Sequence, residues 1–133
     1  MTLDRVNPPE LFRPSGFSHA IVATGGRLVF LAGQTALDVH GQMVGRGDVV
    51  AQFEQAMSNL LVALDGAGGS PEHLAKLTIY AINPDEYRKR TEQIGMVWRW
   101  LVGSNYPAMA LIGVVRLWDP DALVELEGIA VLP

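Results

Sequence analysis

Two glutamates, Glu125 and Glu127, are candidates for chemistry because they lie in the apolar C-terminal segment VELEGIAVLP. If this segment is a strand, both carboxylates lie on one face and Val124, Leu126 and Ala130 on the other, since residues two apart share a face. Partial burial would raise the pKa of a carboxyl group there and suit it to proton transfer near neutral pH. The alternative is an edge strand whose solvated charges prevent aggregation. The segment by itself leaves both interpretations open.

The other reactive residue types show no spacing that indicates a site. His19, His40 and His73 lack the HxxxH or HExxH spacing of metal ligands, so no metal site is expected. The chain has no cysteine, which excludes disulfides and thiolate chemistry. The glycine pairs form neither GxGxxG nor a P-loop, and no serine lies in a GxSxG context. We therefore expect no cofactor and no serine hydrolase.

Composition points to a globular protein that buries surface between subunits. The 133 residues are expected to form one domain, residues 1–133. Hydrophobic residues make up 49% of the chain and charged residues 18%, which is more apolar than a small monomer usually needs. The net charge is −4 and the ten basic residues are scattered. This distribution argues against nucleic acid as a partner, because proteins that bind it cluster lysine and arginine.

Neither export nor membrane insertion is predicted. The N-terminal segment MTLDRVNPPELFRPSG has acidic residues and prolines where a signal peptide has a basic start and an apolar core. The longest apolar run, from Ala108 to Val115, is far shorter than the roughly 20 residues of a membrane helix. The expected location is the cytoplasm, with no membrane as a partner.

Two helices are expected to support the strand that carries the glutamates. Asp48 can cap a helix whose apolar residues recur at steps of three and four until the glycines at 66–69 end it. Asn83 can cap a second helix, which begins with a proline and acidic residues and ends at Gly103.

Five or six strands complete the expected fold. Residues 20–24 and 27–33 flank Gly25-Gly26, which predicts a hairpin with a two-residue turn. Further strands are predicted at 74–82, at 108–115, in VELEGIAV and, as a short element, at 42–45. The order predicts an α+β fold with a mixed sheet and both helices on one face.

The strand at 108–115 also predicts self-association. It is apolar at every position, so both of its faces require cover, whereas two helices can cover only one face of the sheet. No segment is left to cover the second face. Another copy of the chain is the simplest cover, and Glu125 and Glu127 would then lie in or beside a cleft between subunits.

Several segments carry a resemblance to a known family in their order and spacing. These are NPPELF, SGFSHAI, FLAGQTALD, GDVVAQFEQAMSNL, LDGAGGSPEHLAKLTIY, YPAMALIGVVRL and VELEGIAV. Over nearly its whole length the chain resembles the Rid family, also called the YjgF or L-PSP endoribonuclease-like family. The resemblance implies a chorismate-mutase-like α+β fold and a homotrimer with clefts between neighbouring subunits, in agreement with the assembly expected from the apolar strand.

The resemblance also implies an activity and a set of site residues. The best-known family activity is hydrolysis of reactive imines and enamines to 2-keto acids and ammonia. Glu125 corresponds to the family acid that positions or activates water, whereas the arginine that holds the substrate carboxylate is replaced by Met109. A family tyrosine is replaced by Phe17. The remaining pocket positions that the resemblance implies are Gly33, Gln34 and Thr91.

Three functions follow as alternatives. The first is imine or enamine hydrolysis with an altered substrate range, because the thioether of Met109 provides neither a charge nor paired donors. The second is a non-catalytic metabolite-binding or regulatory trimer in which Met109 and Phe17 form an apolar pocket. The third is RNA cleavage or inhibition of translation, which the charge distribution disfavours.

Overall fold

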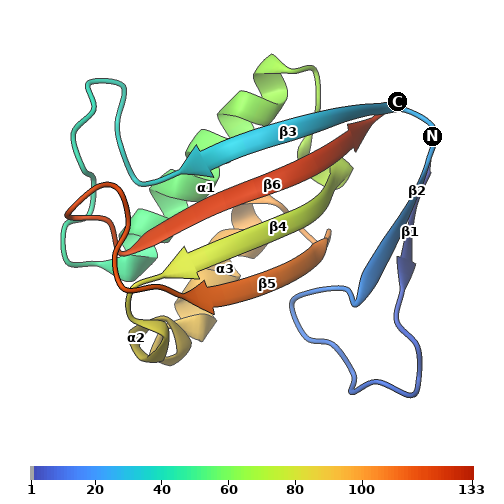
Figure 1. Cartoon of the computed structure of the whole chain (residues 1–133), viewed down its shortest axis with the longest axis horizontal. Coiled ribbons are helices and arrows are strands. Elements are labelled where there is room, and N and C mark those ends of the chain that lie inside the picture. Colours follow the sequence, from blue (N-terminus) through green and yellow to red (C-terminus); the bar gives the residue numbers. More distant parts are fainter. Residues whose placement is uncertain (1) are drawn as a thin grey trace.

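The computed structural model describes residues 2–133, and a four-stranded mixed sheet is its largest element (Figure 1). The strands follow the order β3 (Arg27–Gln34), β6 (Val124–Leu132), β4 (Leu74–Ala81) and β5 (Ala108–Gly113). The β4–β5 pair is parallel, and the β3–β6 and β4–β6 pairs are antiparallel. The predicted α+β class with a mixed sheet is confirmed.

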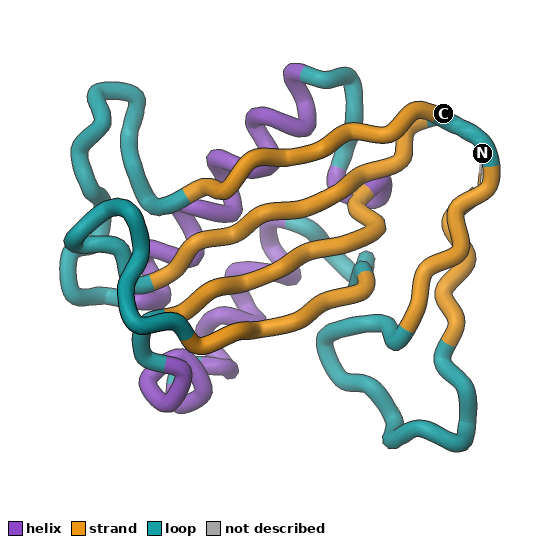
Figure 2. Tube along the Cα trace, in the orientation of Figure 1, coloured by secondary structure: helices purple, strands orange, loops and turns teal. Residues whose placement is uncertain are grey.

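The helices gather on one side of this sheet. The long helices α1 (Val49–Gly66) and α3 (Thr91–Leu101) both lie behind it in the view of Figures 1 and 2. A short 3-10 helix (Pro71–His73) precedes β4. The predicted cap of α1 is confirmed, because the Asp48 carboxylate accepts hydrogen bonds from the backbone N–H groups of Val50 and Ala51 at 3.0 and 3.2 Å.

The predicted second helix is two helices, which corrects the expected number. The short helix α2 (Pro84–Lys89) begins at its predicted cap, Asn83, which accepts from the Glu86 N–H at 3.1 Å. Arg90 then leaves helical geometry, with φ −104° and ψ 16°, before α3 begins. The Thr91 hydroxyl donates to the Arg88 carbonyl at 2.6 Å, a side-chain bond that competes with helix continuation. Periodicity alone did not reveal this break.

The predicted hairpin at 20–33 is wrong. Strand β2 (Ala20–Thr24) pairs with β1 (Thr2–Val6), which the sequence did not predict, and the two form a separate antiparallel ribbon. The six strands within residues 2–133 are therefore divided into sheets of four and two instead of one continuous sheet. The expected strand at 42–45 is reduced to a single bridge between Leu37 and Met43.

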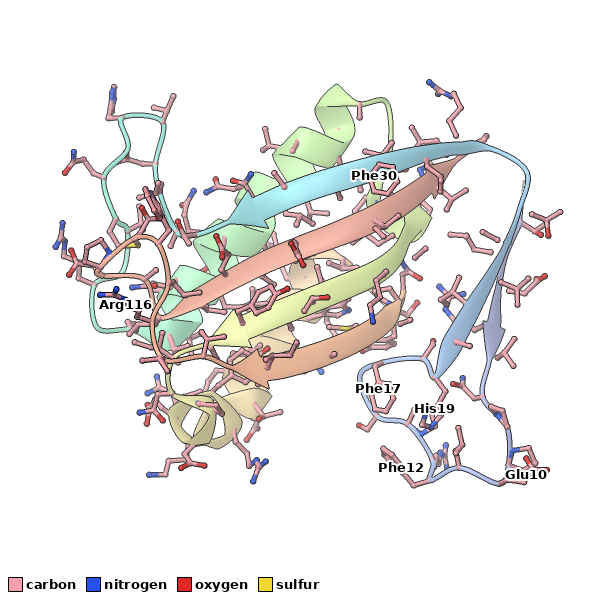
Figure 3. The ribbon with its side chains drawn as sticks, viewed as in Figure 1. Glu10, Phe12, Phe17, His19, Phe30 and Arg116 are labelled. Atoms are coloured by element: carbon pink, nitrogen blue, oxygen red, sulfur yellow. The ribbon has the colours of Figure 1, made fainter. Side chains whose placement is uncertain are left out.

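The core lies between the sheet and the helices, and the other sheet face is open. Side chains of α1, α3, β4 and β6 form the core, in which Phe53, Met57, Leu60, Leu77 and Leu126 are fully buried. On the opposite face, Leu28 and Phe30 of β3 are 62% and 74% exposed, and Figure 3 shows Phe30 on the face away from the helices. The expectation that the helices leave one face uncovered is confirmed for residues 2–133.

Candidate functional site

Glu125 and Glu127 both lie on the open face of the sheet. Along β6, Val124, Leu126 and Ala130 are buried toward the helices, whereas Glu125 is half-buried and Glu127 exposed. This is the alternation that the sequence predicted. Because β6 lies between β3 and β4, it is an interior strand of the four-stranded sheet. The edge-strand interpretation of the two glutamates is therefore wrong.

Glu127 is held by a hydrogen bond across the sheet. The Tyr80 hydroxyl of β4 donates to Glu127 Oε1 at 2.6 Å. This bond to the carboxylate raises the pKa of the Tyr80 hydroxyl, because loss of its proton would break the bond and place two negative charges side by side. Glu127 therefore has a structural partner within its own chain.

Glu125, in contrast, has a carboxylate without a hydrogen-bond donor among the residues that the structure describes. The pKa of the Glu125 carboxyl group is raised mainly by its partial burial, and the negative charges of Asp119 and Glu127 raise it further. A carboxylate with a raised pKa and no donor is suited to accept a proton from water. Glu125 is thus the better candidate of the two glutamates for proton transfer.

The raised pKa predicts a stability cost at neutral pH. Because the pKa of Glu125 is higher in the folded than in the unfolded protein, the folded state binds the proton more tightly. Protonation therefore favours folding at low pH, and this stabilisation is lost as the pH rises through the raised pKa. We therefore expect Glu125→Gln to melt at a higher temperature than the wild type at pH 7, with the difference vanishing below about pH 4, where carboxyl groups are protonated. Melting curves from pH 3 to 8 test this, and a variant that melts lower at pH 7 would contradict it.

Gly33 provides the space that Glu125 occupies. A Cβ atom at Gly33 would lie 2.9 Å from Glu125 Oε1 and 3.0 Å from its Cδ, which is closer than real contacts of this kind. Gln34 follows Gly33 and pairs with Leu126, the neighbour of Glu125 in β6. The structure therefore brings the predicted residues Gly33 and Gln34 together with Glu125.

This close approach predicts the effect of Gly33→Ala. The added methyl must displace the Glu125 carboxylate. If Glu125 is catalytic, this displacement should reduce turnover by about tenfold to a hundredfold, as is typical for a misplaced catalytic group. The melting temperature should change little because Gly33 is exposed. The matched control is Gly66→Ala, whose Cβ meets nothing within 4 Å. Equal turnover of the two variants would contradict this role of Gly33.

The loop before β6 is anchored by a buried amide that the sequence did not single out. Gln52 of α1 is fully buried, and its Nε2 donates to the carbonyls of Gly45 and Asp121 at 3.2 and 3.0 Å. Its Oε1 accepts from the Leu123 N–H at 2.8 Å, two residues before Glu125. A fixed loop keeps the entry to β6, and with it Glu125, in place.

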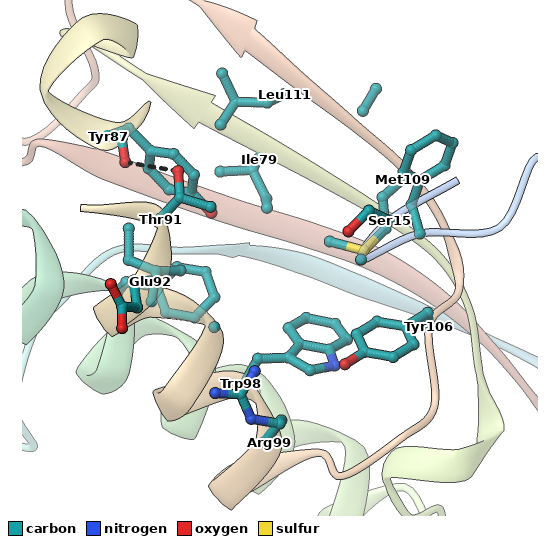
Figure 4. A pocket seen from close by; sticks show the side chains of 16 residues that line it. Ser15, Ile79, Tyr87, Thr91, Glu92, Trp98, Arg99, Tyr106, Met109 and Leu111 are labelled. Carbon is teal, nitrogen blue, oxygen red and sulfur yellow. Dashed lines mark hydrogen bonds between the residues drawn. The ribbon is translucent and has the colours of Figure 1, made fainter. Parts of the chain in front are cut away.

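The other predicted site residues line a cavity on the helix side of the sheet. A cavity of about 540 Å³ lies between β5, α3 and the loop before β2, and Phe17, Thr91 and Met109 all line it (Figure 4). Most of the lining is apolar or aromatic, with Trp98 and Tyr106 stacked at 6.0 Å between ring centroids. Three of the predicted site residues therefore lie in one cavity.

Met109 and Glu125 lie on opposite sides of the sheet within one chain. Met109 pairs with the buried Leu77 and packs against the core, whereas Glu125 pairs with Tyr80 on the open face. The predicted site residues therefore form two groups rather than one. The cavity group also contains Arg99 of α3, which the sequence analysis missed because an exposed helical arginine has no local signature.

Neither a metal centre nor a membrane-spanning helix is found within residues 2–133. No three histidine, cysteine, aspartate or glutamate side chains within residues 2–133 are grouped so that they could share a metal ion. Among the helices of the same residues, none combines the length and the apolar character needed to cross a membrane.

Comparison with known proteins identifies the family. The family model described as Endoribonuclease L-PSP matches residues 12–132. The chain belongs to this family. A RutC family protein of Pyrococcus horikoshii is 32% identical over 93% of this chain and 91% of its own length. The family membership predicted from the sequence is confirmed.

Two other relatives inform fold and activity. The crystal structure of YyfB from Yersinia pestis, a protein of unknown function in the Rid family, has a TM-score of 0.89 with 33% identity, over 99% of this chain and 100% of that one. A protein of Dermatophagoides farinae named 2-iminobutanoate/2-iminopropanoate deaminase is 26% identical over 96% of this chain and 94% of its own. The Rid fold is thus established, while the deaminase activity is a property of the relative.

Proposed function

We propose that this Rid-family protein hydrolyses small imines or enamines in a cleft between copies of the chain, with Glu125 as the group that activates water. The observation that carries the proposal is the Glu125 carboxylate, which has a raised pKa and no donor among residues 2–133. A relative named 2-iminobutanoate/2-iminopropanoate deaminase supports the choice of reaction.

The chemistry requires few groups. A protonated imine is already electrophilic at carbon, so an adjacent water needs only a base that removes one proton as the C–O bond forms. The ionised Glu125 carboxylate accepts that proton. Return of the proton to nitrogen turns the amine into a leaving group. As the C–N bond breaks, Glu125 removes the proton of the new hydroxyl group, which leaves a carbonyl compound, and it passes this proton to the departing ammonia to give ammonium. Glu125 is thereby restored, and no cofactor takes part.

A cleft between copies would unite the two groups of site residues. β5 is the outer strand of its sheet, and Leu111, which lines the cavity, is 39% exposed. The open face beside Glu125 is uncovered among the described residues and carries exposed apolar side chains such as Phe30. In a homotrimer, the Met109 cavity of one copy would adjoin the Glu125 face of the next.

The activity test is ammonia release from an imine generated in situ, such as 2-iminopropionate. Release above the buffer rate that disappears in Glu125→Gln supports the proposal. The matched control is Glu54→Gln, because Glu54 lies on α1 and takes part in neither group of site residues. Wild-type release at the buffer rate for every imine tested would contradict hydrolysis.

Met109 predicts the substrate preference. A thioether cannot hold a carboxylate by charge or by paired donors, so imines with a carboxylate should be poor substrates. We expect Met109→Arg to raise kcat/KM for 2-iminopropionate by about tenfold or more, as a charge-assisted bond is worth roughly 1.5–3 kcal/mol. Met109→Leu is the control without charge. Equal kcat/KM in the two variants would show that Met109 does not face this substrate group.

The cavity itself favours a second candidate function, which is metabolite binding without turnover. A volume of about 540 Å³ suits a small ligand, and Arg99 provides a cation at its wall. An apolar or aromatic ligand with one acidic group would match this lining. Thermal stabilisation by such ligands that persists in Glu125→Gln, together with absence of turnover, would favour binding over catalysis.

A further inference from the structure

The β1–β2 ribbon and the β3 edge are two strand edges without partners in the described chain. β2 pairs with β1 on one side, and β3 pairs with β6 on one side, while the outer edges of both strands are unpaired within residues 2–133. Figures 1 and 2 show the ribbon turned away from β3 at the corner between them. Unpaired edges present free N–H and C=O groups and readily add another strand.

The sequence between these strands is suited to their pairing. Gly25 and Gly26 have φ of 70° and 88°, and positive φ at both central residues is what a type I′ hairpin turn requires. With a two-residue turn in this register, Ala23 would lie opposite Leu28 and Ile21 opposite Phe30. The latter is a β-branched–aromatic pair, which stabilises antiparallel strands. The two edges are therefore complementary although they do not meet in one chain.

The ribbon is prevented from pairing with its own β3 by contacts elsewhere on the body. Ser18, at the entry to β2, is 3% exposed and forms a parallel bridge with Ala108 of β5. Its N–H donates to the Pro107 carbonyl at 3.0 Å and its hydroxyl to the Tyr106 carbonyl at 2.6 Å. In β1, Arg5 donates to the Asn105 side-chain oxygen. The ribbon is thus anchored beside β5, which is the edge strand opposite to β3 in the four-stranded sheet.

We propose that the β1–β2 ribbon of one copy pairs with the β3 edge of another copy, so that neighbouring copies exchange ribbons. Each copy then donates one ribbon and accepts one, and the exchange closes into a ring of identical contacts. The anchored Ser18 stays on its own β5, while β2 extends the four-stranded sheet of the neighbour. The exposed side chains of Leu28 and Phe30 gain cross-strand partners from the incoming ribbon.

The exchange would also hold in place one segment that lines the Met109 cavity. Phe17, which lines the cavity beside Met109, directly precedes the anchored Ser18. A ribbon that pairs with a neighbouring sheet would fix the chain after Ser18 and so restrict the movement of the segment that carries Phe17. The proposal does not depend on imine hydrolysis, since it rests on strand edges and anchors, and it would stand if the protein proved to be a binding protein.

The absence of cysteine from the chain allows a clean disulfide test. We would oxidise the double variant with Ala23→Cys and Leu28→Cys, because these residues form a non-hydrogen-bonded pair in the inferred register, where side chains lie close enough for a disulfide. The exchange predicts covalently linked oligomers on a non-reducing gel. Disulfide-linked monomers would show that the ribbon closes on its own β3, and absence of a disulfide would show that the edges do not meet. Either of these results overturns the proposal.

Two further arrangements make the test decisive. When the single variants Ala23→Cys and Leu28→Cys are unfolded and refolded together, exchange predicts a disulfide between one chain of each kind, whereas closure within a chain predicts none. The double variant with Ile21→Cys and Phe30→Cys repeats the test at the next non-hydrogen-bonded pair, two residues further along each strand. The matched control is Ala23→Cys with Val62→Cys, because Val62 is 72% exposed on α1, on the helix side of the sheet. Equal cross-linking in this control would also overturn the proposal.

Discussion

Replacement of Glu125 by glutamine is expected to reduce kcat for imine hydrolysis by at least about a hundredfold, the lower range for loss of a general base. Glutamine keeps the size of the side chain but cannot accept a proton from water. The fold should persist, because the Glu125 carboxylate accepts no hydrogen bond within residues 2–133 and its charge is disfavoured by Asp119 and Glu127. Kinetics of ammonia release, with melting curves on the same samples, provide the measurement.

Glu127→Gln is the matched comparison for this effect. Glu127 lies two residues away on the same face, but its carboxylate is held by the Tyr80 hydroxyl. Its replacement should leave most of the turnover, because an amide oxygen can still accept this bond. If both variants lost activity equally, the assignment of Glu125 as the single base would be wrong and the pair would have to act together.

Gln52→Leu is expected to reduce the free energy of unfolding by about 1–3 kcal/mol, because partly buried backbone groups would lose their hydrogen-bond partner. Leucine resembles glutamine in size but cannot bond with the carbonyls of Gly45 and Asp121 or the N–H of Leu123. Three backbone groups in two loops would lose their partner. Denaturant unfolding followed by circular dichroism measures the loss.

The control for this prediction is the same substitution at an exposed helical position. Gln93 of α3 is exposed, and its replacement by leucine should change the stability by no more than about 0.5 kcal/mol. A similar loss in both variants would show that the effect is a general one of leucine on a helix. A Gln52→Leu protein as stable as the wild type would show that the loops find other partners.

The helices and the core could be predicted from the sequence because local signals determine them. The Asp48 and Asn83 caps act on backbone groups within one turn, and the α1 stripe that includes Phe53 and Leu60 is buried as its periodicity predicted. The break at Arg90 was missed, because the Thr91 hydroxyl bond that accompanies it carries no pattern. The β1–β2 pairing was missed because Gly25-Gly26 favours a turn without determining which strands meet across it.

The positions of the candidate site residues in the fold could be predicted only in part. Alternation along β6 placed Glu125 on the face away from the core, and the family resemblance singled it out. The separation of Glu125 from Met109 depends on which side chain of β5 faces the helices, and β5 is apolar on both faces, so the sequence could not assign it. The structure adds a second reason to prefer Glu125 over Glu127. This reason is the Tyr80–Glu127 hydrogen bond, a cross-strand contact that only the register reveals.

The most direct test of the account is ammonia release by the wild-type protein from a panel of imines with and without a carboxylate, each compared with its buffer rate. We predict release above the buffer rate for at least one imine that lacks a carboxylate, a weaker effect on 2-iminopropionate, and loss of both in Glu125→Gln. Release at the buffer rate for the whole panel, or release that survives in Glu125→Gln, would contradict the central claim that Glu125 activates water.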